Sequence, residues 1–130
     1  MTAVDTNVLV RIVVNDDPFQ AARAAAFLRQ QDRIFIAKTV LLETEWVLRN
    51  GYGLGRREVL AVLHEILAMG NAEVEDEADV AQAMHWYERG MDFADGLHVA
   101  AAGPECSFAT FDAALRKAGQ RLGAGEFIEI

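Results

Sequence analysis

The sequence predicts an α/β protein, with a three-layer α/β/α fold around a mostly parallel central sheet. Short β-branched or aromatic runs alternate with longer helical patterns along the whole chain, which is typical of this class. Hydrophobic residues make up 52% of the sequence and charged residues 25%, as in ordinary compact globular proteins. At 130 residues, with no linker or low-complexity tract, we expect a single domain over residues 1–130.

The first half of the chain predicts three strands and four helices. Asp17-Pro18 indicates a helix start, with Asp17 as the N-cap, Pro18 at the first helical position and Gln20 three residues after the cap. A glycine-punctuated turn is expected at residues 51–55. The expected strands are residues 2–5, 33–37 and 72–74, and the expected helices are 7–14, 18–29, 39–50 and 56–69.

The second half predicts three helices and two strands. Asp76 is expected to cap a helix over residues 77–88, and Asp92 opens a helix that stops at Gly103-Pro104. A strand over 107–110, a helix over 112–118 and a final strand over 126–130 complete the pattern. On the helix after Asp92, the expected buried stripe is Phe93, Leu97, Ala100 and Ala101.

Composition excludes some classes of protein and leaves others open. Charges interrupt every apolar run well before the ~20 residues of a membrane span, and we see no secretion signal. The single cysteine, Cys106, fits a reducing cytoplasm and is expected to be a core thiol. The net charge of −8 is weak evidence against a nucleic-acid partner, because cations could neutralise a carboxylate site. Binding would require the basic residues to gather on one rim, namely Arg49, Arg56, Arg57, Arg116, Lys117 and Arg121.

Asp5 is the first candidate for a functional residue. It stands in Thr2-Ala-Val-Asp-Thr-Asn-Val-Leu-Val-Arg11, between two apolar runs, and we expect it to be at least partly buried. Burying an ionised carboxylate costs several kcal/mol unless a base, backbone N–H groups or a metal ion compensates for it. We interpret the compensating group as a metal ion. Asp5 and Asp112 each follow a predicted strand, where sites of parallel sheets lie.

Two glutamates on the helix over residues 39–50 have different surroundings. Glu45 has Arg49 four residues later, and we interpret the two as a solvated surface pair. Glu43 has no cation within four residues in either direction, so its partner must come from elsewhere in the fold. This difference favours Glu43 as the site residue.

The remaining candidate acids are Asp92, Asp95 and Asp112. Asp92 and Asp112 both have a plausible N-cap role, which is compatible with metal binding because a carboxylate has two oxygens. Asp95 borders the apolar stripe of the helix that Asp92 opens, so of these two aspartates it is the more inward one. No Ser-His-Asp order, phosphate-binding glycine loop or Cys-His pair offers a rival chemistry.

The chain resembles the PIN-domain family and, within it, the VapC-type toxins of type II toxin–antitoxin systems. Four motifs carry the resemblance, in order along the chain: Val4-Asp-Thr-Asn-Val-Leu-Val10, Val40-Leu-Leu-Glu-Thr-Glu-Trp-Val-Leu-Arg49, Asp92-Phe-Ala-Asp-Gly-Leu-His-Val-Ala100 and Ala109-Thr-Phe-Asp112. The match implies an acidic quartet of Asp5, Glu43, Asp95 and Asp112. Asn7, Asp92 and Thr110 follow as secondary positions around the metal.

This resemblance implies a metal-dependent endoribonuclease that holds Mg²⁺ or Mn²⁺ in the quartet. Asp5, Asp95 and Asp112 are then the expected metal ligands, and Glu43 either binds through water or positions the attacking hydroxide. The resemblance also implies RNA as substrate, a homodimer and a cognate VapB-type antitoxin. The helices around Trp46 and over Leu60–Leu67 could form such interfaces, although core packing explains them equally well.

The chain departs from the family pattern at two places, and two alternative functions remain open. The family usually has a larger residue, such as Ala, where this chain has Gly96, and the last motif has the compact spacing Thr110-Phe-Asp112. A phosphatase of the haloacid-dehalogenase type also begins with a strand and an aspartate. It normally needs a second aspartate two residues later, where this chain has Asn7. A catalytically silent PIN-like module that binds RNA or protein is the other alternative, and the intact acids argue against it.

Overall fold

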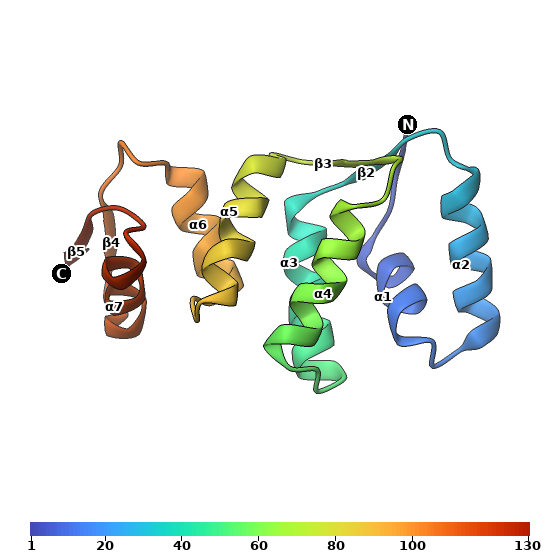
Figure 1. Cartoon of the computed structure of the whole chain (residues 1–130), viewed down its shortest axis with the longest axis horizontal. Coiled ribbons are helices and arrows are strands. Elements are labelled where there is room, and N and C mark those ends of the chain that lie inside the picture. The colour runs from blue at the N-terminus through green and yellow to red at the C-terminus, as the bar shows by residue number, and fades with distance from the viewer. The chain divides into compact units, whose positions relative to one another are not determined.

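The computed structural model describes all residues from Met1 to Ile130, which form two compact units. The first unit runs from Met1 to Asp76 and the second from Glu77 to Ile130 (Figure 1). All strand pairs are parallel, and seven α-helices alternate with the strands along the chain. This confirms the predicted α/β class and is consistent with a three-layer α/β/α fold. No helix has the length and apolar character that a membrane span requires.

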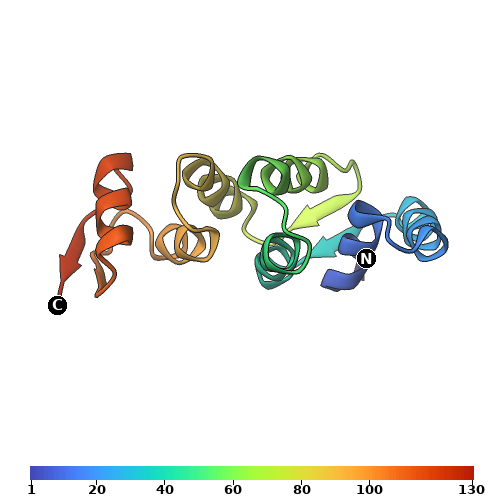
Figure 2. The ribbon, with the colours of Figure 1, turned by 90° about the horizontal axis from the view of Figure 1, so that it is seen from below.

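The first unit contains a three-stranded parallel sheet in the order β1-β2-β3. Thr2 pairs with Ile34 across β1 and β2, and Ile36 pairs with Val74 across β2 and β3. Figures 1 and 2 show the helices of this unit gathered around its strands. The elements are β1 (Thr2–Ala3), α1 (Thr6–Val14), α2 (Pro18–Gln30), β2 (Ile34–Ile36), α3 (Lys38–Trp46), the π-helix η1 (Val47–Gly51), α4 (Arg56–Leu67) and β3 (Ala72–Val74).

The strand β2 forms the centre of this sheet, as its apolar sequence predicts. Ile34 and Ile36 are fully buried, since the strand is covered by neighbours on both edges and its isoleucines face the core. The predicted start of α2 is confirmed as well. The Asp17 carboxylate accepts a hydrogen bond from the Gln20 amide at 3.1 Å, and Pro18 occupies the first turn.

The third helix differs from its prediction. One α-helix was expected over residues 39–50, but α3 ends at Trp46 and a π-helical segment, η1, continues from Val47 to Gly51. Short π-helical segments are wider than α-helical turns and often accompany functional sites. Apolar spacing in the sequence cannot distinguish the two, because Leu41 and Leu48 are buried in either geometry.

The second unit contains a two-stranded parallel sheet of β4 and β5, in which Phe108 pairs with Phe127 and Thr110 with Glu129. Its last helix continues past the predicted end at residue 118 and stops at Gly123, whose φ of 65° suits a left-handed C-cap. The elements are α5 (Glu77–Glu88), α6 (Phe93–Ala102), β4 (Phe108–Thr110), α7 (Ala113–Leu122) and β5 (Phe127–Glu129).

Helices α5 and α6 pack closely in this unit. Phe93 is fully buried and its ring meets Tyr87 edge to face, with centroids 5.7 Å apart. Gly96 is buried, and a Cβ placed there would lie 3.2 Å from the Cβ of Ala83. Glycine at position 96 therefore allows a close approach of the two helices.

Three local predictions are wrong. Cys106 is exposed because it lies in a turn in which its amide donates to the Gly103 carbonyl. Ala101 is exposed because it lies roughly 80° around the helix from Phe93, at the edge of the buried stripe. Asp76 does not have the extended backbone of an N-cap. Its φ is 45°, and its carboxylate instead pairs with the Lys38 ammonium at 2.8 Å.

Candidate functional site

Asp5 lies two residues after the end of β1 and caps α1. Its Oδ1 accepts a hydrogen bond from the backbone amide of Asn7 at 3.1 Å. The expectation that Asp5 is partly buried is wrong, because its side chain is exposed. Val4 and Thr6 are both buried and occupy the inward positions on either side, so the carboxylate between them faces outward. The hydrogen bond uses one oxygen, which leaves the other to bind a ligand.

Glu43 lies in the second turn of α3, which begins directly after β2. Its side chain is exposed and forms no ion pair or hydrogen bond. Since β1 and β2 are parallel neighbours, their carboxyl ends lie at the same edge of the sheet. Asp5 and α3, which carries Glu43, thus both follow strands that end at this edge.

Glu45 corrects the interpretation of a solvated surface pair. Its side chain is only 2% exposed, and it accepts hydrogen bonds from the Nε and Nη2 of Arg49 at 2.6 and 3.4 Å. Leu41, Glu45 and Leu48 are all buried, at the i, i+4 and i+7 spacing of one helix face. This spacing was present in the sequence and was the signal that could have identified Glu45 as a buried acid.

In the second unit, Asp92 caps α6 as predicted. Its Oδ2 accepts a hydrogen bond from the Asp95 amide at 3.2 Å. Asp95 itself is half-buried. The pKa of the Asp95 carboxyl is raised, first by burial and then by the negative charges of Asp92 and Asp112, whereas His98 acts in the opposite direction. The three aspartates therefore share one electrostatic environment.

Asp112 follows β4 and caps α7. Its backbone amide donates to the Thr110 hydroxyl at 3.0 Å, and its Oδ1 accepts from the Leu115 amide at 3.1 Å. Thr110 thus shapes the turn that carries Asp112. As with Asp5, capping uses one carboxylate oxygen.

Each unit contains part of the predicted quartet. Asp5 and Glu43 belong to the first unit, and Asp95 and Asp112 to the second. In neither unit does a group of three or more acidic, histidine or cysteine side chains form a metal site. The donor chemistry nevertheless suits Mg²⁺ or Mn²⁺, which prefer carboxylate oxygens. The raised pKa of Asp95 fits this, because a cation would relieve the same repulsion between carboxylates.

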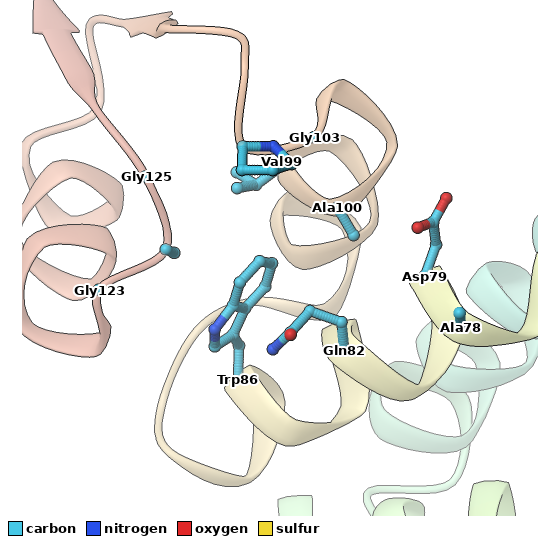
Figure 3. A pocket seen from close by; sticks show the side chains of 11 residues that line it. Ala78, Asp79, Gln82, Trp86, Val99, Ala100, Gly103, Gly123 and Gly125 are labelled. Carbon is cyan, nitrogen blue, oxygen red and sulfur yellow. The ribbon is translucent and has the colours of Figure 1, made fainter.

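A cavity in the second unit lies away from these acids. It has a volume of about 370 Å³, and Figure 3 shows the indole of Trp86 beside it. Gly103 and Gly123, which end α6 and α7, line it, whereas Asp92 and Asp112 begin these helices. The cavity is therefore at the opposite helix ends from the carboxylates.

Comparison with known families gives one match: the model of the PIN domain covers residues 2–120. PIN domains are generally nucleases, and the matched range includes Asp5, Glu43, Asp95 and Asp112. None of the curated proteins and none of the solved structures matches the chain.

Proposed function

Since the chain belongs to the PIN domain family, we propose that it is a metal-dependent endoribonuclease and the toxin of a VapBC-type toxin–antitoxin pair. The observation that carries the proposal is the placement of Asp95, which is half-buried at the start of α6 and near the charges of Asp92 and Asp112; burial and these charges both raise its pKa. Neighbouring carboxylates that repel one another, as these do despite the opposing effect of His98, are typical of a site that binds a divalent cation. Burial is the larger cause of the shift, and it also favours cation binding, because water is partly displaced there.

The residues have distinct roles in this proposal. Asp5, Asp95 and Asp112 hold Mg²⁺ or Mn²⁺, and Asn7, Asp92 and Thr110 support them. When bound, the cation supplies a water molecule of lowered pKa and offsets negative charge on the phosphodiester. Glu43, which has no partner in its own unit, orients the attacking water and accepts its proton.

We also propose that residues 1–130 act as a single PIN domain. One family model continues across the boundary between Asp76 and Glu77, which supports this. A single domain predicts one cooperative thermal transition whose calorimetric and van't Hoff enthalpies agree. Two separate transitions would contradict it.

The decisive experiment is titration with Mn²⁺ in a calorimeter, together with cleavage of RNA, for wild type and Asp5→Asn. Asparagine keeps the cap on α1 but removes the charge, so the variant should fold, bind Mn²⁺ weakly and lose cleavage. Asp17→Asn is the matched control, because Asp17 also caps a helix through its Oδ1, which accepts from the Gln20 amide, and it lies outside the quartet. If Asp5→Asn cuts RNA as fast as wild type, the site assignment is wrong. If wild type binds no metal, a silent binding module becomes the better interpretation.

The proposed partners are an RNA substrate, a VapB-type antitoxin and a second copy of the chain. Trp46, whose side chain is 58% exposed on α3, supports an interface there. The helix α4 offers less, because Leu60, Val62, Leu63 and Ile66 are buried and serve the core. Light scattering at micromolar concentration should give a dimer, and a monomer would remove that part of the proposal.

A further inference from the structure

Arg116 lies one helical turn after Asp112 on α7, and its side chain is only 16% exposed. Its Nη1 donates to the carbonyl oxygen of Thr110 at 3.3 Å, and its Nη2 lies 3.5 Å from Oε1 of Glu129. Thr110 and Glu129 pair with each other as the last residues of β4 and β5. The guanidinium group therefore contacts the carboxyl ends of both strands of this sheet.

These contacts belong to a closed set of hydrogen bonds around Asp112. Thr110 accepts from Arg116 through its carbonyl and from the Asp112 amide through its hydroxyl. Asp112 in turn accepts from the Leu115 amide through Oδ1 and from the Arg116 amide through its carbonyl. Arg116 is thus bonded to the turn both through its backbone and through its side chain.

Of the two bonds that Arg116 makes in this set, the backbone bond to Asp112 is part of the ordinary helical pattern, whereas the side-chain bond to Thr110 is specific to arginine at this position. The ion pair with Glu129 is weak, because the Glu129 side chain is 75% exposed to water. A guanidinium group has a planar fork of donors, which lets it hold a carbonyl oxygen and a carboxylate at once. Lysine would keep the charge but lose this fork.

We propose that Arg116 is a positioning residue for Asp112: by holding the Thr110 carbonyl, it fixes the turn that aims the Asp112 carboxylate at the metal site. This inference rests on the proposed function. Outer contacts that orient a metal ligand typically change metal affinity or activity by 10–100-fold when they are removed. Arg116 acts through Asp112, because its side chain is only 16% exposed and its guanidinium group is bonded to Thr110 and Glu129.

The test compares Arg116→Ala with Arg121→Ala. Arg121 is the matched control, because it lies on the same helix and also donates to a backbone carbonyl, that of Arg89, at 2.9 Å. Arg116→Ala should weaken Mn²⁺ binding about tenfold in calorimetry and lower kcat by a similar factor, with KM for RNA nearly unchanged. Arg121→Ala should leave the affinity for Mn²⁺ close to wild type; because Arg121 is one of the basic residues that could contact RNA, its kcat and KM are not compared. Equal losses of Mn²⁺ affinity in the two variants would overturn the proposal, as would a raised KM with unchanged kcat in Arg116→Ala.

A second readout needs neither metal nor activity. Amide hydrogen exchange at Asp112 and Leu115 in the metal-free protein should be faster in Arg116→Ala and unchanged in Arg121→Ala. Unchanged exchange in Arg116→Ala would refute the positioning role even if wild type proves not to be a nuclease. If Arg116→Ala fails to fold, Arg116→Lys and Glu129→Gln take its place. The lysine variant should show faster exchange, and Glu129→Gln should resemble wild type.

Discussion

Asp112 caps α7 and is a proposed metal ligand, and a pair of substitutions distinguishes these two roles. Asp112→Ala removes both the charge and the cap on α7, whereas Asp112→Asn removes only the charge, because asparagine caps helices as well as aspartate does. Both variants keep the bond from the residue-112 amide to the Thr110 hydroxyl, since that bond uses the backbone. Both also remove the charge that helps to raise the pKa of Asp95. The difference in stability between them therefore isolates one hydrogen bond, from the Leu115 amide to Oδ1.

The size of that difference follows from the capping bond. Loss of an N-cap typically costs about 1 kcal/mol, and Leu115, whose amide it would leave unpaired, is 5% exposed in the core of the second unit. For a chain of this length, about 1 kcal/mol corresponds to a shift in Tm of roughly 4 °C. Asp112→Ala should thus melt roughly 4 °C below Asp112→Asn.

Thermal unfolding in the presence of a chelator measures the capping effect without any contribution from bound metal. Calorimetric titration with Mn²⁺ then measures the ligand role, and both variants should lose affinity to the same extent. If the two variants melt at the same temperature, the cap does not contribute to stability. If Asp112→Asn binds Mn²⁺ as wild type does, Asp112 is not a metal ligand.

Three further substitutions test other parts of the structure. Asp95→Asn should be more stable than wild type at pH 7 without metal, because a raised pKa in the folded state means that ionised Asp95 costs stability above that pKa. In guanidinium unfolding, the advantage should disappear as pH falls through the raised pKa toward the ordinary value. Arg49→Met should lower the free energy of unfolding in urea by about 2 kcal/mol, because it leaves the buried Glu45 carboxylate without its partner. The loss is smaller than for a fully buried ion pair, since the Arg49 side chain is 41% exposed. An unchanged free energy of unfolding would contradict the burial of Glu45. In Gly119→Ala the new Cβ would overlap the ring of Phe127, and this overpacking outweighs the gain in helix propensity. The variant should therefore be less stable than wild type by about 1 kcal/mol in urea unfolding. In a Phe127→Leu background the same substitution should instead raise stability.

The features that sequence predicted well are those decided by neighbours in the chain. The caps at Asp17, Asp92 and Asp112 depend on a carboxylate within reach of an amide three residues later, and all three are present. The strand over Ala72–Val74 and the helix over Glu77–Glu88 have their predicted ends. The cap at Asp76 failed, because an ion pair with Lys38, distant in sequence, accompanies a different backbone conformation there.

Burial was harder to predict than local structure. Glu43 and Glu45 lie two residues apart on one helix, and sequence reasoning took Glu45, which has Arg49 four residues later, to be the solvated one, whereas it is the buried one. An adjacent cation does not imply a solvated pair, because arginine can reach from the surface to a buried carboxylate while its own side chain stays 41% exposed. The apolar period of α3, through Leu41 and Leu48, was the better guide to which glutamate faces the core.

In the structure, the carboxylate that a bound cation would stabilise most is Asp95, not Asp5. The sequence argument began with Asp5, on the ground that its burial must be compensated, but Asp5 is exposed and carries no such cost. Asp95 does carry it, because it is half-buried and lies near the charges of Asp92 and Asp112. If a divalent cation binds, the free energy it recovers by relieving repulsion comes mainly from Asp95. Metal should therefore stabilise wild type more strongly than Asp95→Asn, even where Asp5 and Asp112 are intact.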